Sequence, residues 1–232
     1  MAIRIDIISA VPDLLHGVFS HSIIGNAISK ELAEVHVHDL RDYSTDKHKK
    51  IDDYPYGGGG GMVLTPEPIF SCIEHLEKQR TYDEIIYTTP AGKLFDQQKA
   101  NKLSLKKNII ILCGHYKGVD QRVRDHLITQ EISIGDFVLS GGEIPAMAIT
   151  DAIIRLLPGV LGDAESALSD SFQDELLLEG PQYTRPATFK NMRVPEVLRS
   201  GDHQKIEQWK HQKSVQITKK RRPDLFKNYT AN

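Results

Sequence analysis

The sequence predicts an α/β fold with a mainly parallel sheet, followed by a smaller helical part. Over the first 161 of 232 residues, short β-branched runs alternate with helical patterns. This alternation is typical of a parallel sheet with helices on both faces. The run Asn108–Cys113 is apolar without alternation, as in a strand buried on both sides. After Leu161 the chain becomes acidic and polar, and then basic, which indicates a second unit.

The expected elements follow one another in the order that such a fold requires. Five strands are predicted, at 3–8, 35–38, 84–89, 108–113 and 131–134. Five helices are predicted between and after them, at 11–30, 66–78, 96–105, 119–127 and 143–157. Ser140-Gly-Gly-Glu143 fits a capping box, in which Ser140 accepts from the first free amides of the last helix and Glu143 reaches back. Pro145 suits the first turn of that helix.

Length and composition favour a globular protein. A chain of 232 residues, 40% hydrophobic and 26% charged, has room for a medium domain and a smaller one. No apolar run reaches the roughly 18 to 20 residues of a membrane-spanning helix, and the first residues lack the layout of a signal peptide. Cys72 and Cys113 form no CxxC pair. We therefore expect a cytoplasmic protein without a membrane partner and without disulfides.

The charge is divided unevenly along the chain. The net charge is only −2. Residues 163–180 contain six acidic residues and no Lys or Arg, whereas residues 205–232 hold eight Lys or Arg against two acidic residues, a local charge of +6. We predict a sheet domain at 1–161, a linker at 162–173 and a small basic helical domain at 174–232. Such asymmetry is typical of a nucleic-acid surface.

Three glycine-bearing turns follow three of the strands, at 87–92, 113–118 and 134–143. Ligands bind at the carboxyl ends of parallel strands, and glycine lets the backbone approach a flat ligand such as adenine. The alternative is that each glycine only supports a positive φ at a turn. The GxGxxG, GxxxxGK[ST], GxSxG and HExxH patterns are all absent.

Other candidates have ordinary explanations beside functional ones. His36 and His38 share a strand face, which fits either a metal site or plain strand histidines. Asp151 and Arg155 are four residues apart, as in a surface ion pair. Asp170 lies in the acidic stretch, where a solvated carboxylate is the default. The loop 41–65, with Tyr54, Tyr56, five consecutive glycines and several basic residues, suits RNA contacts or a flexible surface.

Several motifs in a fixed order carry a family resemblance from Ile5 to Tyr229. They include Asp52-Asp53-x-Pro55-Tyr56, Cys113-Gly-His-Tyr116, Ser133-Ile-Gly-Asp-Phe-Val-Leu-Ser-Gly-Gly-Glu143, Asp170-Ser-Phe172, Tyr183-Thr-Arg-Pro186 and Ser200-Gly-Asp-His203. The sequence resembles the bacterial tRNA (guanine-N1)-methyltransferases, which belong to the SPOUT class. The resemblance implies the SPOUT fold, in which the end of the sheet domain forms a deep trefoil knot, with a small all-helical C-terminal domain.

The resemblance also implies a methyl donor, S-adenosylmethionine, held by the knot loops. The cofactor-binding residues that it implies are Tyr87, Thr88, Pro90, Gly114, Tyr116, Gly118, Ile134, Gly135, Asp136, Phe137, Val138, Leu139, Gly141, Gly142 and Pro145. Family members also depend on Mg²⁺, but Lys117 stands where many of them carry Glu and argues against one acidic contact. Two further departures are Gly60 in place of Pro and Gln182 in place of His.

The implied reaction is methylation of N1 of guanosine 37 in tRNA, next to the anticodon. Asp170 matches the family's catalytic Asp, a general base, and Arg155 matches the Arg that stabilises O6. The implied substrate-binding residues are Asp52, Tyr56, Gly58, Gly59, Ser166, Tyr183, Arg185 and His203. A homodimer with active sites built from both chains is implied as well.

Three alternatives remain open at this point. A ribose 2′-O-methyltransferase would share the fold but modify another atom. An RNA-binding protein without catalysis would account for the basic C-terminal segment alone. A nicotinamide-dependent enzyme would suit the parallel sheet, although the missing GxGxxG argues against it.

Overall fold

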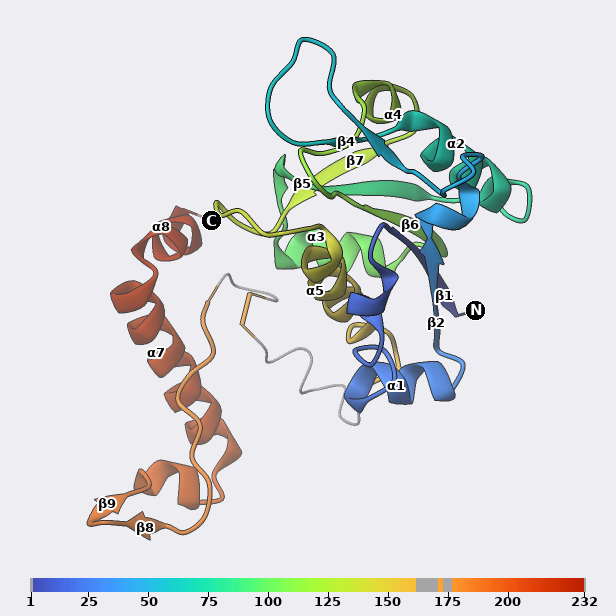
Figure 1. Cartoon of the computed structure of the whole chain (residues 1–232). Coiled ribbons are helices and arrows are strands. Elements are labelled where there is room, and N and C mark those ends of the chain that lie inside the picture. The colour runs from blue at the N-terminus through green and yellow to red at the C-terminus, as the bar shows by residue number, and fades with distance from the viewer. Residues whose placement is uncertain (1, 162–170, 173–176, 232) are drawn as a thin grey trace. The chain divides into compact units, whose positions relative to one another are not determined.

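The chain forms two compact units, residues 1–162 and 163–232, which are described separately (Figure 1). The structure, a computed structural model, describes residues 2–161, 171–172 and 177–231. Ser166 and Asp170, two of the predicted site residues, lie outside the described residues.

A five-stranded parallel sheet forms the centre of the first unit, in the order β2-β1-β6-β5-β7. The predicted parallel sheet is therefore confirmed, since each pair of neighbouring strands is parallel. The strands are β1 (Ile3–Ser9), β2 (Ala33–Asp39), β5 (Glu84–Leu94), β6 (Asn108–Cys113) and β7 (Gln130–Ser133). A separate short ladder joins β3 (Asp52–Asp53) to β4 (Val63–Leu64).

Helices cover both faces of this sheet because the central strand β6 is apolar on both sides (Figure 1). Ile109 and Ile111 pack into one core with α1, α3 and α5, while Ile110 and Leu112 pack into the other with α2 and α4. The helices are α1 (Ser22–Ser29), α2 (Pro66–Glu77), α3 (Gln97–Ser104), α4 (Gln121–His126) and α5 (Glu143–Ile154). A fully buried isoleucine contributes about 1.5 to 3 kcal/mol.

The first predicted helix, 11–30, is wrong in its first half. A short 3-10 turn, η1 (Pro12–Leu15), comes first, and α1 starts only at Ser22. Gly17 has φ +90° and Ser22 has φ +57°, so the backbone leaves the helical region twice. The apolar residues of 11–30 keep a helical spacing, although the backbone is not helical between η1 and α1.

The second unit combines helices with a hairpin, so the prediction of an all-helical part is wrong in this detail. The hairpin pairs β8 (Thr188–Phe189) with β9 (Met192–Arg193). Lys190 and Asn191 form its turn with φ +46° and +63°, the conformation of a tight two-residue hairpin. A 3-10 turn η3 (Glu196–Arg199), the long α7 (His203–Arg221) and α8 (Pro223–Ala231) follow.

The segment before the hairpin lies along α7. Gly180 packs against this helix, where an added Cβ would lie 3.2 Å from the Lys210 carbonyl oxygen. The Leu178 N–H donates to Thr218 Oγ1 at 2.8 Å, and Thr218 is fully buried. Asp202 caps α7 by accepting from the Lys205 N–H at 3.2 Å. These contacts organise the second unit around one helix.

Within the described ranges, no helix is long and apolar enough to cross a membrane. Cys72 and Cys113 are both free thiols in the core.

Candidate active site

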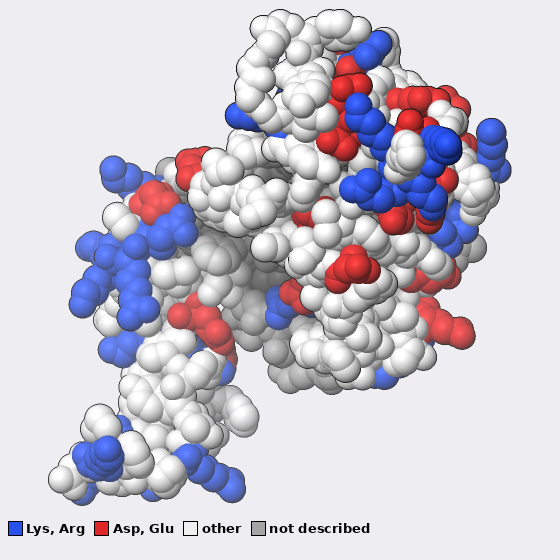
Figure 2. All heavy atoms as spheres, in the orientation of Figure 1, with Lys and Arg blue, Asp and Glu red and all other residues white. Residues whose placement is uncertain are grey.

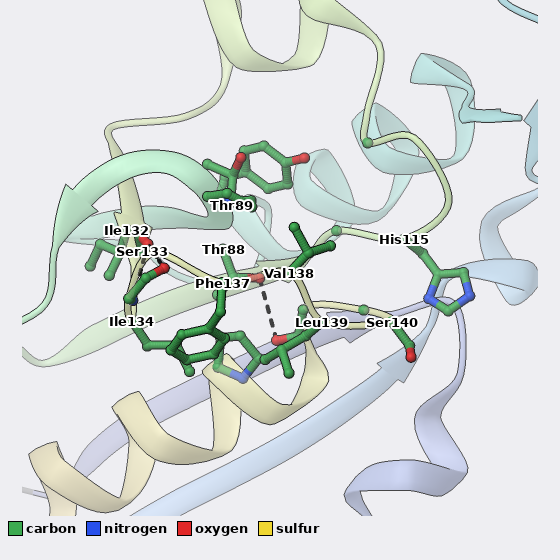
Figure 3. Close-up of a pocket in the computed structure, with 18 of the residues that line it drawn as sticks. Thr88, Thr89, His115, Ile132, Ser133, Ile134, Phe137, Val138, Leu139 and Ser140 are labelled. Carbon is green, nitrogen blue, oxygen red and sulfur yellow. Dashed lines mark hydrogen bonds between the residues drawn. The ribbon is translucent and has the colours of Figure 1, made fainter. Parts of the chain in front are cut away.

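A cavity of about 400 Å³ lies between a bulge in β5 and the segments that follow β6 and β7, where the three glycine-bearing segments meet (Figure 3). Its volume is typical of small-molecule sites. Its lining consists of Tyr87, Thr88, Thr89, Pro90, Gly114, His115, Tyr116, Lys117, Gly118, Ile132, Ser133, Ile134, Gly135, Phe137, Val138, Leu139, Ser140, Gly141, Gly142 and Pro145.

The first wall is a bulge within β5, a strand that continues past the predicted end at residue 89. Ile132 of β7 is the register partner of both Thr88 and Lys93, so the residues between them arch away from the ladder. Gly92 lies against β7, where an added Cβ would approach the Glu131 carbonyl carbon to 2.5 Å. Only glycine fits this close approach of two backbone segments.

The second and third walls are joined by backbone hydrogen bonds. The Gly142 N–H donates to the Gly114 carbonyl at 2.7 Å, and His115 pairs with Gly141 in an antiparallel bridge. The Thr88 hydroxyl lies within hydrogen-bond distance of the Gly142 carbonyl, at 3.3 Å (Figure 3). An added Cβ at Gly142 would lie 2.8 Å from the Cys113 Cα. Glycine is therefore required where these turns touch.

The turn after β6 also holds the base of the long glycine loop. The Lys117 N–H donates to the Met62 carbonyl at 2.9 Å, and the Leu64 N–H donates to the Gly118 carbonyl at 3.0 Å. The Lys117 side chain lies along Gly61, where an added Cβ would be 2.9 Å from its Cγ. Backbone hydrogen bonds thus join the cavity wall to the base of the glycine loop.

The structure brings the predicted cofactor-binding residues together, with one exception. All of them line the cavity except Asp136, which lies in the same turn but outside the lining. Sequence reasoning missed Thr89, His115, Lys117, Ile132, Ser133 and Ser140, which also line it. All except Ile132 are adjacent in sequence to a predicted residue, and Ile132 is two positions before Ile134. Closeness in sequence to the predicted turns was therefore the available signal.

The predicted capping box at the start of α5 is wrong. Gly142 occupies the cap position and no side chain caps the helix, although Pro145 does fall in its first turn. Glu143 is instead buried, and its Oε1 accepts a hydrogen bond from Ser9 Oγ of β1 at 2.7 Å. Because the Glu143 side chain packs against β1, it does not reach back to cap the helix as its spacing had indicated.

Arg155 lies at the opposite end of α5 from the cavity. It directly follows the helix, and its N–H donates to the Asp151 carbonyl at 3.1 Å. Pro145, in the first turn of the same helix, lines the cavity. Ten residues of helix separate the two by about 15 Å along the axis. Within one chain, the two ends of α5 therefore hold different predicted parts of the site.

The predicted RNA contacts of the first unit lie on the glycine loop. Asp52 belongs to β3, where it pairs with Leu64 of β4 and fixes the loop base. Tyr56 is fully exposed, and Gly58 and Gly59 have φ +79° and +110°. An exposed aromatic ring near positive-φ glycines is available for contacts with a partner.

The predicted contacts of the second unit are spread over its surface. Tyr183 is half-exposed, and its ring centroid lies 6.3 Å from that of Trp209. Arg185 precedes a cis proline, and His203 is the exposed first residue of α7. Lys and Arg gather over α7 and α8 in Figure 2, and the last turn of α7 contributes Lys219, Lys220 and Arg221.

Comparison with known proteins agrees with this architecture. The sequence model of the family described as tRNA (guanine-1)-methyltransferase TrmD matches residues 3–228. A tRNA (guanine-N(1)-)-methyltransferase of Flavobacterium psychrophilum is 60% identical over 225 residues, 97% of this chain and 100% of the relative. That of Cytophaga hutchinsonii is 59% identical over 227 residues, 98% of this chain and 96% of the relative. The chain belongs to the tRNA (guanine-1)-methyltransferase family.

Proposed function

We propose that this chain is an S-adenosylmethionine-dependent methyltransferase that modifies N1 of guanosine 37 in tRNA. The observation that carries the proposal is the family match over residues 3–228, together with a cavity at the strand ends where the family's donor residues converge.

The cavity fits the donor in size and chemistry. Five glycines belong to its lining, and they leave backbone hydrogen-bond groups open to an adenosine without bulky side chains. An added Cβ at Gly114 would lie 3.1 Å from the Thr88 carbonyl, so the glycines also keep the turns close together. The donor supplies a methyl group on a positive sulfonium. Among the described residues, no group of three or more His, Cys, Asp or Glu is placed to hold a metal.

Asp170 and Arg155 are the proposed catalytic residues, following the family's motif. Guanine N1 carries a proton and becomes a good nucleophile only when that proton leaves, so the Asp170 carboxylate accepts it. Negative charge then develops on O6, which the Arg155 guanidinium stabilises. Methyl transfer is direct, without a covalent link between enzyme and substrate.

We further propose that two chains share each active site. Arg155 lies about 15 Å along α5 from the cavity end of that helix, so a second copy is the natural source of one part of the site. Four exposed apolar side chains support a pairing face. Leu14 of η1 and Ile23 of α1 lie on elements that each contact α5, which carries Ile144, and Val18 lies in the turn between η1 and α1. Exposed apolar clusters of this kind mark interfaces.

The proposed division of labour follows the two units. Residues 1–161 bind the donor in a knotted sheet domain, residues 162–173 form the linker, and residues 174–232 bind tRNA. The double pairing of Ile132 with both sides of the β5 bulge supports the knot, since β7 must pass close beneath that bulge. The basic end of α7 supports an anionic partner.

The decisive experiment is methyl transfer from labelled donor to a tRNA transcript with G at position 37. Digestion to nucleosides and mass spectrometry then identify the methylated atom. We expect N1-methylguanosine, and a matched transcript with A at position 37 is the control. A methylated ribose would favour the 2′-O alternative, and absence of transfer would favour an RNA-binding protein without catalysis.

A further inference from the structure

Glu143, the first residue of α5, is a buried carboxylate beside Gly141 and Gly142, which line the cavity. Its side chain is 1% exposed. Oε1 accepts from Ser9 Oγ at 2.7 Å, and Ser9 Oγ in turn accepts from the Val11 N–H at 2.9 Å. Oε2 is buried and has no hydrogen-bond partner among the described residues. An unsatisfied carboxylate oxygen is costly in the interior and calls for an explanation.

His115 offers the complementary atom. Its Nδ1 is also buried without a hydrogen-bond partner in the described part of the chain, while the residue lines the cavity (Figure 3). An added Cβ at Gly141 would lie 2.8 Å from His115 Nδ1 and closer still to Glu143 Oε2. Both atoms therefore adjoin the same small space beside Gly141. The antiparallel bridge between His115 and Gly141 keeps the two backbones at this spacing.

When Glu143 is ionised and the His115 ring is neutral, the two atoms can satisfy each other in only one way. An ionised carboxylate oxygen only accepts, whereas Nδ1 of a neutral imidazole donates when it carries the hydrogen. A small rotation of the His115 ring, or of the carboxylate, brings Nδ1–H to Oε2. This arrangement selects the Nδ1–H tautomer and leaves Nε2 as a hydrogen-bond acceptor.

We propose that Glu143 is a positioning residue, which holds the His115 ring in the Nδ1–H form so that Nε2 accepts a hydrogen bond from the ligand in the cavity. Ser9 anchors the carboxylate to β1 from the other side. Gly141 is required between them because any side chain there would separate Glu143 from His115. That the ligand is the methyl donor rests on the proposed function, whereas the pairing of the two residues does not.

The neighbouring groups are compatible with this pairing. Burial, and then the charge of Glu143, raise the pKa of the Cys113 thiol, so this group stays neutral. The Tyr116 ring meets the His115 ring edge-on, with centroids 4.7 Å apart. Lys117, the following residue, lines the cavity. The imidazole is thus packed on one side by an aromatic ring and faces the carboxylate on another.

The first test is the tautomer of His115, read from ¹⁵N spectra of the full-length protein at a pH where the ring is neutral. We expect Nδ1–H in the unmodified protein and a shift to Nε2–H in Glu143→Gln. Glu74→Gln, at an exposed position of α2, is the matched control and leaves the spectrum unchanged. Because no ligand is present, this outcome does not depend on the proposed function. If Glu143→Gln does not fold, an Nε2–H signal for His115 in the unmodified protein alone overturns the proposal.

The second test is calorimetric binding of S-adenosylmethionine. Glu143→Gln and His115→Phe are expected to bind about tenfold more weakly, the effect of losing one buried charge-assisted hydrogen bond. His115→Asn, whose amide hydrogen replaces that of Nδ1, is expected to lie nearer the unmodified protein than His115→Phe does. Equal affinity of His115→Phe and the unmodified protein for S-adenosylmethionine would show that the imidazole forms no hydrogen bond with it.

Discussion

Asp6 is the clearest case of a single residue whose surroundings decide its properties. It is fully buried in β1 and accepts hydrogen bonds from His38 Nε2 and Tyr82 OH, both at 2.8 Å, and from the Arg4 guanidinium. Burial by itself would raise the pKa of this carboxyl group. The hydrogen bonds from His38, Arg4 and Tyr82 outweigh burial and hold the pKa well below its ordinary value. His38 therefore acts as a structural strand histidine.

Asp6→Asn is expected to lower the free energy of unfolding at pH 7 by about 3 kcal/mol, because it leaves the half-buried Arg4 guanidinium without its nearest counter-charge. Since the folded state depresses the pKa, this stabilisation is present above about pH 4 and fades as the pH falls below it. Urea unfolding at pH 7 and pH 3 measures both effects. Glu34→Gln, which alters an exposed partner of Arg4 at 3.4 Å, is the control. An equal loss at both pH values would contradict the charge argument.

A substitution at a single residue also tests the proposed general base, Asp170. Asp170→Ala is expected to reduce turnover on the tRNA transcript by at least about a hundredfold, the usual contribution of a general base. Donor affinity should stay unchanged, because the proposed role of Asp170 is at guanine N1 and not at the donor. Single-turnover kinetics and donor calorimetry separate the two effects, and unreduced turnover would remove Asp170 from the proposed mechanism.

At the scale of elements, the glycines of the cavity turns are required for two different reasons. Gly118 has φ +121°, a backbone conformation that other residues rarely adopt. Gly92 and Gly142 have no such φ, but neighbouring backbone leaves no room for a Cβ. The sequence does not distinguish a glycine required for its φ from one required for lack of space. Only the surrounding strands distinguish the two.

Gly92→Ala is expected to lower the free energy of unfolding by about 1 to 3 kcal/mol, because the added methyl group pushes the β5 bulge away from β7. Donor affinity should fall as well, since the bulge is a cavity wall. Gly60→Ala is the control, since an added Cβ there meets nothing within 4 Å and its φ is ordinary. Thermal unfolding and donor calorimetry give the two readings. A stable Gly92→Ala variant with normal affinity would contradict the close approach.

The hairpin of the second unit is the element that composition did not indicate. Phe189 and Met192 face each other across it and are 57% and 63% exposed, and the Lys190 ammonium lies 5.5 Å from the Phe189 ring centroid. Exposed aromatic and cationic groups on a rigid turn suit base stacking and phosphate contact.

Phe189→Ala is expected to raise the KM for tRNA about tenfold, the effect of losing one stacking contact, with stability and donor affinity unchanged. The matched control is Leu105→Ala in the first unit, where another apolar side chain is 84% exposed. Steady-state kinetics with varied tRNA measures the change. An unaltered KM would assign the exposed ring to some other partner.

At the scale of the whole molecule, the proposed sharing of sites between two chains has a direct test. Arg155→Ala removes one part of the site, and Val138→Trp fills the cavity from an exposed lining position. Each variant alone should be inactive. Co-expressed in equal amounts, they should recover about a quarter of the activity, because half of the dimers then contain one intact site. The activity of the whole co-expressed dimer population measures this, and no recovery would place Arg155 and the cavity of one chain in the same site.

The sequence by itself determined the strand order along the chain and the helices on both faces, because periodicity reports burial locally. It also determined which turns carry the cavity, because glycines cluster after strands whose ends must meet in a parallel sheet. The family resemblance rested on motif order, which is likewise a property of the sequence.

Only the tertiary structure decided what the individual side chains do. Glu143 has the spacing of a helix cap, but packing against β1 turns it into a buried partner of Ser9. His115 stands in the motif Cys113-Gly-His-Tyr116 but was not among the predicted binding residues, because its partner in the bridge, Gly141, lies 26 positions away. Periodicity records which residues are apolar, whereas the partner that each side chain meets is fixed only when distant segments pack together.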